Sequence, residues 1–152
     1  MIEENIKNMG YNIPETPKPL AAYIPVKKVD NLVFTAGQLP MVEGKLIAEG
    51  KLGAEVSVEL GVKAAEICTL NCLSVIKSSI VDLDNIEQIV KVTVFVNSSD
   101  GFTAQPQIAN GASELLVNFF GEAGKHVRSA VGVNELPINA PVEIEMIVKI
   151  KE

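Results

Sequence analysis

A long apolar helix pattern places the strongest limit on how this chain can fold. Residues 54–80 carry apolar side chains at helical spacing, on one stripe and on the positions beside it: Leu60, Val62, Ala64, Ala65, Ile67, Leu73, Ile76 and Ile80. A helix that is apolar over so wide an arc needs a broad partner, and a sheet offers such a surface. Asn71 falls on the same stripe, which predicts a buried amide whose hydrogen bonds are satisfied within the protein.

Strand patterns lie on both sides of this helix. Segments 21–29 and 31–40 are apolar and β-branched, and the Asp30-Asn31 pair between them predicts a hairpin. Pro25 inside the first segment favours an edge position or a bulge. The remaining elements are predicted in the order strand 86–97, helix 105–120, strand 127–134 and strand 141–151.

This order of elements predicts an α+β domain, a mixed β-sheet with two helices packed on one face. The chain has 152 residues, which suffices for one hydrophobic core but not for two, so we expect a single domain over 1–152. Within it, residues 1–19 are expected to form a short helix and an extended, proline-rich arm. Hydrophobic residues make up 47% of the chain, so we expect some apolar surface to be buried against other copies.

The acidic composition excludes several classes of partner. The formal net charge is −6, whereas nucleic-acid binding needs clustered Lys and Arg. The same charge gives no support for docking on an anionic membrane. The N-terminal residues lack the apolar core of a signal peptide, and no apolar run approaches the length of a membrane span. We therefore expect a soluble, cytoplasmic protein with neither nucleic acid nor membrane as a partner.

The two cysteines, Cys68 and Cys72, lie four residues apart on one face of the predicted helix. A disulfide that closes so short a helical loop is geometrically unfavourable. A metal pair would need further ligands, and the one histidine, His126, is distant in sequence. We expect two buried thiols in a reducing environment, with neither a metal site nor a disulfide.

Charged residues interrupt the apolar strand patterns near the C-terminus. Arg128 lies in predicted strand 127–134, and an unpaired buried guanidinium is costly, so it needs an anion. A structural ion pair and a bound carboxylate both satisfy this need, and both stay open. Glu143 and Glu145 share one face of predicted strand 141–151. Either both are solvated, or one faces a cleft with Arg128 and holds or activates water. Their mutual repulsion predicts a cation partner or a raised pKa for at least one of them.

Three further residues carry less specific signals. His126 adjoins Arg128 and is interpreted as a lone surface histidine rather than a general base. Tyr23 lies near the predicted edge strand, where a core or interface role is the default interpretation. Gly37 lies in segment 31–40, where its backbone N–H can approach a ligand closely. No Ser-His-Asp set, zinc-binding motif or phosphate-binding loop accompanies these residues in the sequence.

Several segments, in order and at matching spacing, resemble the RidA (YjgF) family, for which the name endoribonuclease L-PSP is also used. The carriers of the resemblance are AAYIPVKKVDNLVFTAGQLP (21–40), KVTVFVNSSDGF (91–102) and HVRSAVGVNELPINAPVEIEMIVKI (126–150). The resemblance runs from about Pro19 to the C-terminus. NGASELLVNFFGEAGKHVRSAVGV (110–133) is similar to a subgroup of slightly longer family members.

The resemblance implies a chorismate-mutase-like fold and a homotrimer with clefts between subunits. It implies an enamine/imine deaminase, a hydrolase that converts reactive 2-imino acids to 2-keto acids and ammonia. By position, Arg128 matches the arginine that grips the substrate carboxylate, and Glu143 the glutamate that positions the attacking water. Tyr23 matches a tyrosine that lines the cleft from the neighbouring subunit, and Gly37 a backbone contact. An arginine and a glutamate suffice for this hydrolysis, so no metal or organic cofactor is expected.

Three positions depart from the family pattern. Ala130 stands where many relatives have cysteine, which excludes a thiol nucleophile there, Ala36 stands in place of a serine, and Ser113 in place of an asparagine. The less polar pocket that these residues imply favours a bulkier or more apolar substrate. Two alternatives stay open: a deaminase of the 2-aminomuconate type, and a non-enzymatic trimer that binds small carboxylates or client proteins. RNA cleavage is not expected of so acidic a chain.

Overall fold

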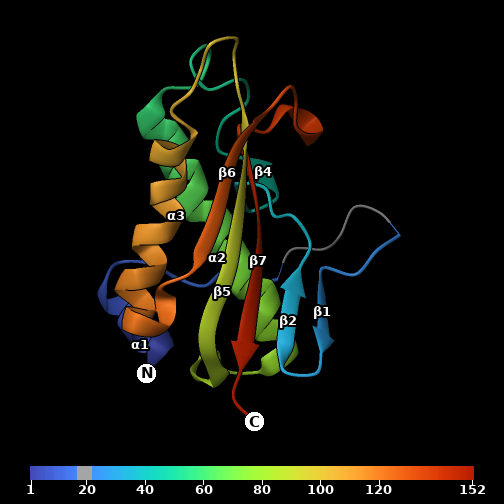
Figure 1. Cartoon of the computed structure of the whole chain (residues 1–152), viewed down its shortest axis with the longest axis vertical. Coiled ribbons are helices and arrows are strands. Elements are labelled where there is room, and N and C mark those ends of the chain that lie inside the picture. Colours follow the sequence, from blue (N-terminus) through green and yellow to red (C-terminus); the bar gives the residue numbers. More distant parts are fainter. Residues whose placement is uncertain (17–21) are drawn as a thin grey trace.

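A five-stranded mixed sheet organises the fold, in the strand order β1-β2-β7-β5-β6 (Figure 1). The computed structural model describes residues 1–16 and 22–152, so residues 17–19 of the expected arm and position 21 of the first predicted strand lie outside the described residues. The elements are α1 (Ile2–Asn8), β1 (Val26–Val29), β2 (Leu32–Thr35), β3 (Met41–Val42), β4 (Lys45–Leu46), α2 (Val58–Ile80), β5 (Ile86–Asn97), α3 (Gln105–Phe120), β6 (Val127–Val133) and β7 (Val142–Ile150).

Strand β5 lies between the two other strands of the C-terminal half of the chain, β6 and β7. It pairs antiparallel with β7 and parallel with β6. A parallel neighbour requires a crossover connection, and α3 forms this crossover between β5 and β6. On the other side of β7, strands β2 and β1 add an antiparallel hairpin. The predicted α+β class and the mixed sheet are therefore confirmed.

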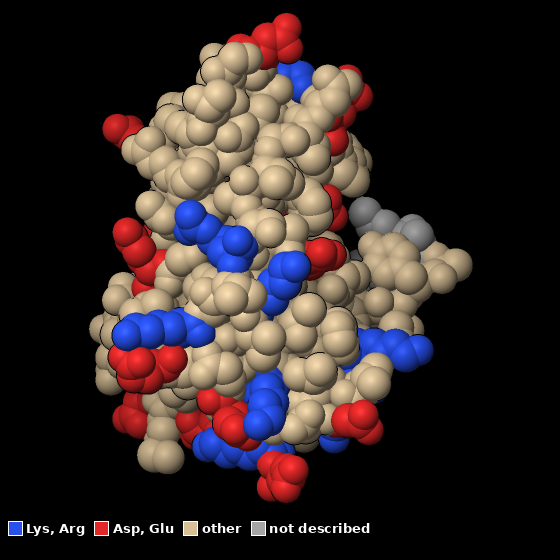
Figure 2. Space-filling view, viewed as in Figure 1, with Lys and Arg blue, Asp and Glu red and all other residues tan. Residues whose placement is uncertain are grey.

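Helices α2 and α3 cover one face of this sheet. Figure 1 shows α2 running behind β5 and β7, so that the view looks onto the other, uncovered face. The strand residues that point toward the helices are apolar and buried: Val92, Val94, Val96, Val142, Ile144, Met146 and Val148. On the uncovered face, charged side chains gather toward the end of the molecule where both termini lie (Figure 2). No helix in the described part of the chain is long and apolar enough to cross a bilayer.

Two predicted boundaries are wrong, each for a local reason. Helix α2 begins at Val58 rather than at Ala54, because the Ser57 hydroxyl oxygen accepts the backbone N–H of Leu60 and caps the helix there. Strand β1 begins only after Pro25, whose nitrogen has no hydrogen to donate. The edge position that this proline predicted is confirmed, because β1 is an outer strand of the sheet.

The two cysteines are buried free thiols, as predicted. The Sγ atoms of Cys68 and Cys72 lie 3.7 Å and 3.4 Å from the backbone carbonyl oxygens of Val142 and Ile144, to which they donate. Burial raises the pKa of both thiols, that of Cys72 to about 12. Neither thiol therefore ionises near neutral pH, and their role is to join α2 to β7.

The Asn71 side chain joins α2 to the segment that follows β2. Its Nδ2 donates to the backbone carbonyl oxygens of Leu39 and Met41 at 3.0 Å and 3.1 Å. The side chain is 3% exposed, so the predicted buried and satisfied amide is confirmed. Because Gly37 lies two residues before Leu39, this amide also helps to fix the backbone around Gly37.

We predict that Asn71→Ala lowers the free energy of unfolding by about 2–3 kcal/mol, because it leaves two carbonyl groups without their amide donor and removes buried contacts. Urea unfolding followed by circular dichroism measures the loss, with an unchanged dependence on urea concentration. Asn118→Ala, at an exposed position of the neighbouring helix α3, is the matched control and should change stability little. Equal losses in the two variants would contradict a structural role for Asn71.

Candidate active site

Arg128 lies on the helix-covered side of edge strand β6. It is in register with Val92 of parallel strand β5, whose side chain is buried beneath the helices, so Arg128 projects toward α3. Its Nη1 donates to Oδ1 of Asn110 at 2.8 Å and to Oγ of Ser113 at 3.2 Å, both on α3. Among the described residues, no carboxylate forms a salt bridge with this guanidinium. The guanidinium is thus held by neutral oxygens, which leave its positive charge uncompensated.

The hydrogen bonds of Arg128 determine which edge of the guanidinium can receive an anion. Nη1 carries two hydrogens, and Asn110 and Ser113 account for both. The donors without a partner among the described residues are those on Nε and Nη2, which lie along one edge of the guanidinium plane. Two parallel N–H donors on one edge match the two oxygens of a carboxylate. This arrangement favours a bound carboxylate over the structural ion pair.

Glu143 lies on the uncovered face of the sheet. Its neighbours in β7, Val142 and Ile144, are fully buried on the covered face, and Glu143 is paired with Phe95 of β5. The carboxylate packs beside Gly37, where a Cβ atom would clash with Oε1 of Glu143. The glycine therefore provides the space that the carboxylate occupies, close to where β2 ends.

Burial raises the pKa of Glu143 above its usual value, and the charge of Glu145 on the same face of β7 raises it further. This confirms the expectation that one of the two glutamates gains a raised pKa. A carboxylate with a raised pKa is a stronger base than an ordinary glutamate, which favours its acceptance of a proton from water. The electrostatics of this face therefore suit proton transfer at Glu143.

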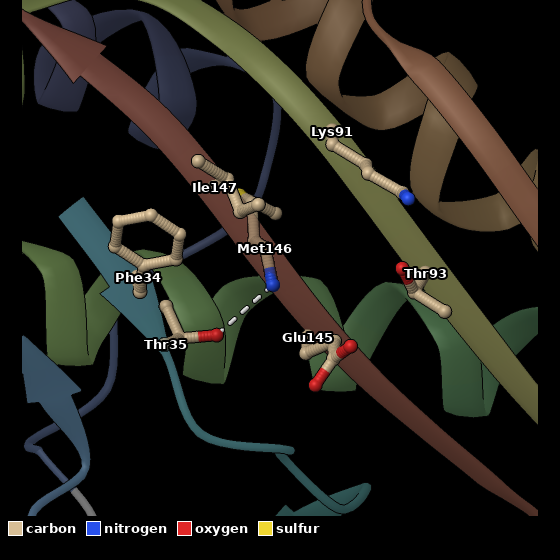
Figure 3. A pocket seen from close by; sticks show the side chains of 7 residues that line it. All are labelled: Phe34, Thr35, Lys91, Thr93, Glu145, Met146 and Ile147. Atoms are coloured by element: carbon tan, nitrogen blue, oxygen red, sulfur yellow. Dashed lines mark hydrogen bonds between the residues drawn. The ribbon is translucent and has the colours of Figure 1, made fainter. Parts of the chain in front are cut away.

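A cavity of about 140 Å³ lies on the same face, beside Glu145 (Figure 3). Its lining residues come from β2, β5 and β7: Phe34, Thr35, Lys91, Thr93, Glu145, Met146 and Ile147. Figure 3 shows the side chains of Glu145 and Thr93 close together, with Lys91 further along β5. Glu145 lines this cavity and Glu143 does not, although the two carboxylates are near enough for their charges to interact.

Tyr23 lies at the β1–β2 edge of the sheet. Its side chain is 50% exposed and lines an open depression of about 570 Å³ together with Phe34 and Ala36. Ala36 precedes Gly37, so the depression adjoins the backbone that carries the Glu143 contact. The tyrosine is thus available to a ligand or to another chain on the same side of the molecule as Glu143.

The predicted site residues, together with Asn110, fall into two groups on opposite faces of the sheet. The arginine half-site lies on the covered side, at the β6 edge: Arg128, Asn110, Ser113, His126 and Ala130. The glutamate half-site lies on the uncovered side, toward the β1–β2 edge: Glu143, Gly37 and Tyr23. Within one chain, Glu143 and Arg128 do not share a cleft, because the two residues occupy opposite phases of the strand pleat; a cleft that they share between neighbouring subunits stays a prediction.

Two residues of the arginine half-site were missed from the sequence. Asn110 binds Arg128 directly but sits in a helix without any motif of its own. His126 was interpreted as a lone surface histidine, and this is wrong: it is half-buried, and its Nε2 lies 2.8 Å from Oγ of Ser113. Its position two residues before Arg128 was the available signal, because both then lean toward α3.

Comparisons with known proteins agree with the fold and show the family. A family model described as "YjgF/chorismate_mutase-like, putative endoribonuclease" matches residues 3–149. Protein TCP17 of Trypanosoma cruzi is 37% identical over 98% of this chain and 94% of its own. A 2-iminobutanoate/2-iminopropanoate deaminase of Dermatophagoides farinae is 30% identical over 91% of this chain and 93% of its own. The crystal structure of Atu1372, a protein of unknown function from Agrobacterium tumefaciens, superposes with a TM-score of 0.93 at 40% identity, covering 99% of this chain and 92% of that one.

We predict that Glu143→Gln stabilises the protein at neutral pH but not at about pH 4. The folded-state pKa of Glu143 is raised, so its ionisation costs the native state free energy as pH rises through that pKa, and glutamine avoids this cost. The side chain is partly exposed, so the gain is at most about 1 kcal/mol, or roughly 3 °C in Tm.

Thermal melts at the two pH values and one protein concentration measure the difference between variant and wild type. Glu114→Gln, at an exposed position of α3, is the control and should show no such pH dependence. A gain for Glu143→Gln that is equal at both pH values would contradict the raised pKa.

Proposed function

Because the chain belongs to the YjgF/chorismate mutase-like family, we propose that it is a hydrolytic deaminase of reactive 2-imino and enamine acids, yielding 2-keto acids and ammonia. The observation that carries the proposal is the Arg128 guanidinium, which is fixed through Nη1 and offers its Nε–Nη2 edge to a carboxylate. A relative that spans nearly the whole chain is named as a deaminase of this kind. The family also includes proteins with other names, so the reaction needs its own test.

In the proposed reaction, the substrate carboxylate docks on the free edge of Arg128. This anchors the adjacent C=N carbon, which is electrophilic because it is bonded to nitrogen and to the carboxylate carbon. Ser113 and Asn110 keep the guanidinium from rotating, so the ligand meets an orientation that is already set. Ala130 lies two residues after Arg128 on β6, and its methyl group is not a nucleophile.

Glu143 then acts on water. Its carboxylate accepts a proton as the water oxygen attacks the C=N carbon, which forms a tetrahedral carbinolamine. With the imine nitrogen protonated at the start, this leaves a neutral carbinolamine, and Glu143 returns the same proton to its nitrogen. Glu143 then accepts the hydroxyl proton as the C–N bond breaks and the C=O bond forms, and it passes this proton to the departing ammonia. The sum is imino acid plus water giving keto acid plus ammonia. The raised pKa of Glu143 makes its carboxylate a stronger base toward water than an ordinary glutamate.

A site that uses both Arg128 and Glu143 requires two copies of the chain. Within one copy, the strand pleat directs the two side chains to opposite faces of the sheet. The arginine half-site lies at the β6 edge and the glutamate half-site toward the opposite edge. Head-to-tail contact of unlike edges would bring the half-sites of neighbouring copies together, and such contacts form a ring when the rotation between copies closes. We propose a ring of three, as the family resemblance implies.

Exposed apolar side chains support an assembly of this kind. Those near the two sheet edges include Tyr23 at 50% exposed, Ile24 at 63%, Phe34 at 37%, Val127 at 66% and Val131 at 44%. Val127 and Val131 lie on β6, whereas the others lie at the β1–β2 side. Contact between these two groups of side chains would bury apolar surface from both edges at once.

We predict that Arg128→Ala lowers kcat/KM for imine hydrolysis by about 100-fold or more, because the bidentate carboxylate contact is lost. The assay generates an imino acid with an amino-acid oxidase and times the release of keto acid. Arg128→Lys is the matched variant, since it keeps the charge but not the fork, and should recover only a small part of the rate. Wild-type protein that leaves keto-acid release unchanged would refute the deaminase proposal for that substrate.

We also predict that two inactive variants restore activity when their subunits are exchanged. In an equal mixture of Arg128→Ala and Glu143→Gln chains, about a quarter of the shared sites would combine an intact Arg128 from one chain with an intact Glu143 from its neighbour. Denaturing and refolding the variants together should therefore recover about a quarter of wild-type activity. Each variant refolded alone is the control. No recovery, under conditions in which mass spectrometry shows mixed assemblies, would place both residues in one chain's site.

A further inference from the structure

His126 occupies a place that the proposed reaction does not use. Its Nδ1 lies 2.7 Å from the backbone carbonyl oxygen of Gly124, and its Nε2 lies 2.8 Å from Oγ of Ser113. Ser113 in turn accepts a hydrogen bond from Nη1 of Arg128. We propose that His126 is a positioning residue, which orients the Ser113 hydroxyl so that this hydroxyl holds the carboxylate-binding arginine in place. The inference rests on the proposed function for the role of Arg128 but not for the hydrogen bonds themselves.

Three hydrogen bonds connect Gly124, His126, Ser113 and Arg128 in series. Their directions follow from the carbonyl group at one end of the series and the guanidinium at the other. A carbonyl oxygen only accepts, so Nδ1 of His126 carries a hydrogen and donates it to Gly124. In the neutral imidazole the other nitrogen, Nε2, is then an acceptor, and Ser113 Oγ–H donates to it. A guanidinium only donates, so Arg128 donates to Ser113. The histidine is thereby fixed as the Nδ1–H tautomer.

The histidine matters because a hydroxyl group has a single hydrogen. With Nε2 of His126 as its acceptor, the Ser113 hydrogen points away from Arg128, and an oxygen lone pair faces Nη1. Without that acceptor, the hydroxyl rotates among several directions, some of which turn its hydrogen toward the guanidinium. The other anchor of Nη1, Asn110, lies on the exposed surface of α3 and has no such support among the described residues. Loss of His126 should therefore loosen Arg128.

A purely structural role for His126 would depend on a different ring nitrogen from the positioning role. The Nδ1 bond to Gly124 spans two residues and stabilises the turn before β6, whereas the Nε2 bond reaches Ser113 on α3. Asparagine can place an amide donor near the position of Nδ1 but cannot reach Ser113. Glutamine can place an amide oxygen near the position of Nε2. If positioning is the role, glutamine should substitute for the histidine, and if turn stability is the role, asparagine should.

The first test needs no ligand and exploits the fact that the chain has one histidine. A long-range ¹H–¹⁵N correlation spectrum of the whole protein, recorded where the imidazole is neutral, reports which nitrogen carries the hydrogen. We expect the Nδ1–H tautomer in wild type, and a larger share of the Nε2–H tautomer in Ser113→Ala, where the donor to Nε2 is missing. A wild-type spectrum of the Nε2–H tautomer would overturn the proposal, whatever the protein's activity.

The second test measures binding of 2-ketobutyrate by calorimetry and imine turnover in the coupled assay. We expect His126→Asn to bind about fivefold more weakly, with KM raised more than kcat is lowered, and His126→Gln to stay within about twofold of wild type. Ser113→Ala should weaken binding at least as much, and adding His126→Asn to it should cause no further loss.

The opposite order of the two substitutions, or losses that add fully in the double variant, would overturn the positioning role. The wild-type protein separates the two proposals. If it neither binds the keto acid nor turns over imines, the proposed function fails, whereas the tautomer spectrum still decides the orientation of Ser113.

Discussion

The pleat of the β-strands is the constraint on which the rest of this structure depends. Side chains alternate between the two faces, and only one face is covered by helices. Strand β7 therefore buries Val142, Ile144 and Met146 and directs Glu143 and Glu145 outward. On β6 the same rule turns Arg128 toward α3. The positions of the charged groups thus follow from the packing of the apolar ones.

The elements of the fold were largely predictable from the sequence, because periodicity reports burial directly. Strand β5 and helix α3 have the predicted bounds, 86–97 and 105–120. The start of α2 was wrong because a single hydroxyl, that of Ser57, decides it, and hydrophobic spacing does not report hydrogen bonds. The edge strand was foreseen from Pro25, because a missing N–H is a property of the residue itself.

The candidate site was less predictable, for reasons of register. The sequence shows which residues of one strand share a face. It does not show whether residues of two different strands lie on the same face of the sheet. The sequence therefore indicated that Glu143 and Glu145 share a face, yet it could not indicate that Arg128 faces the other way. His126 and Asn110 depend on how α3 lies over β6, which is a property of the packed structure. Ser113 was placed through family resemblance, and its bond to Arg128 is consistent with that placement.

The buried cysteines make this protein convenient to label. The chain has two cysteines, both beneath the sheet, and their raised pKa values keep the reactive thiolate form scarce at neutral pH. A new cysteine at an exposed position outside the proposed contacts between copies, such as Val81 after the end of α2, would react with a maleimide far faster than either native thiol. Fluorophores could thus be attached at such a position without first removing the native cysteines, whose hydrogen bonds to β7 would remain in place.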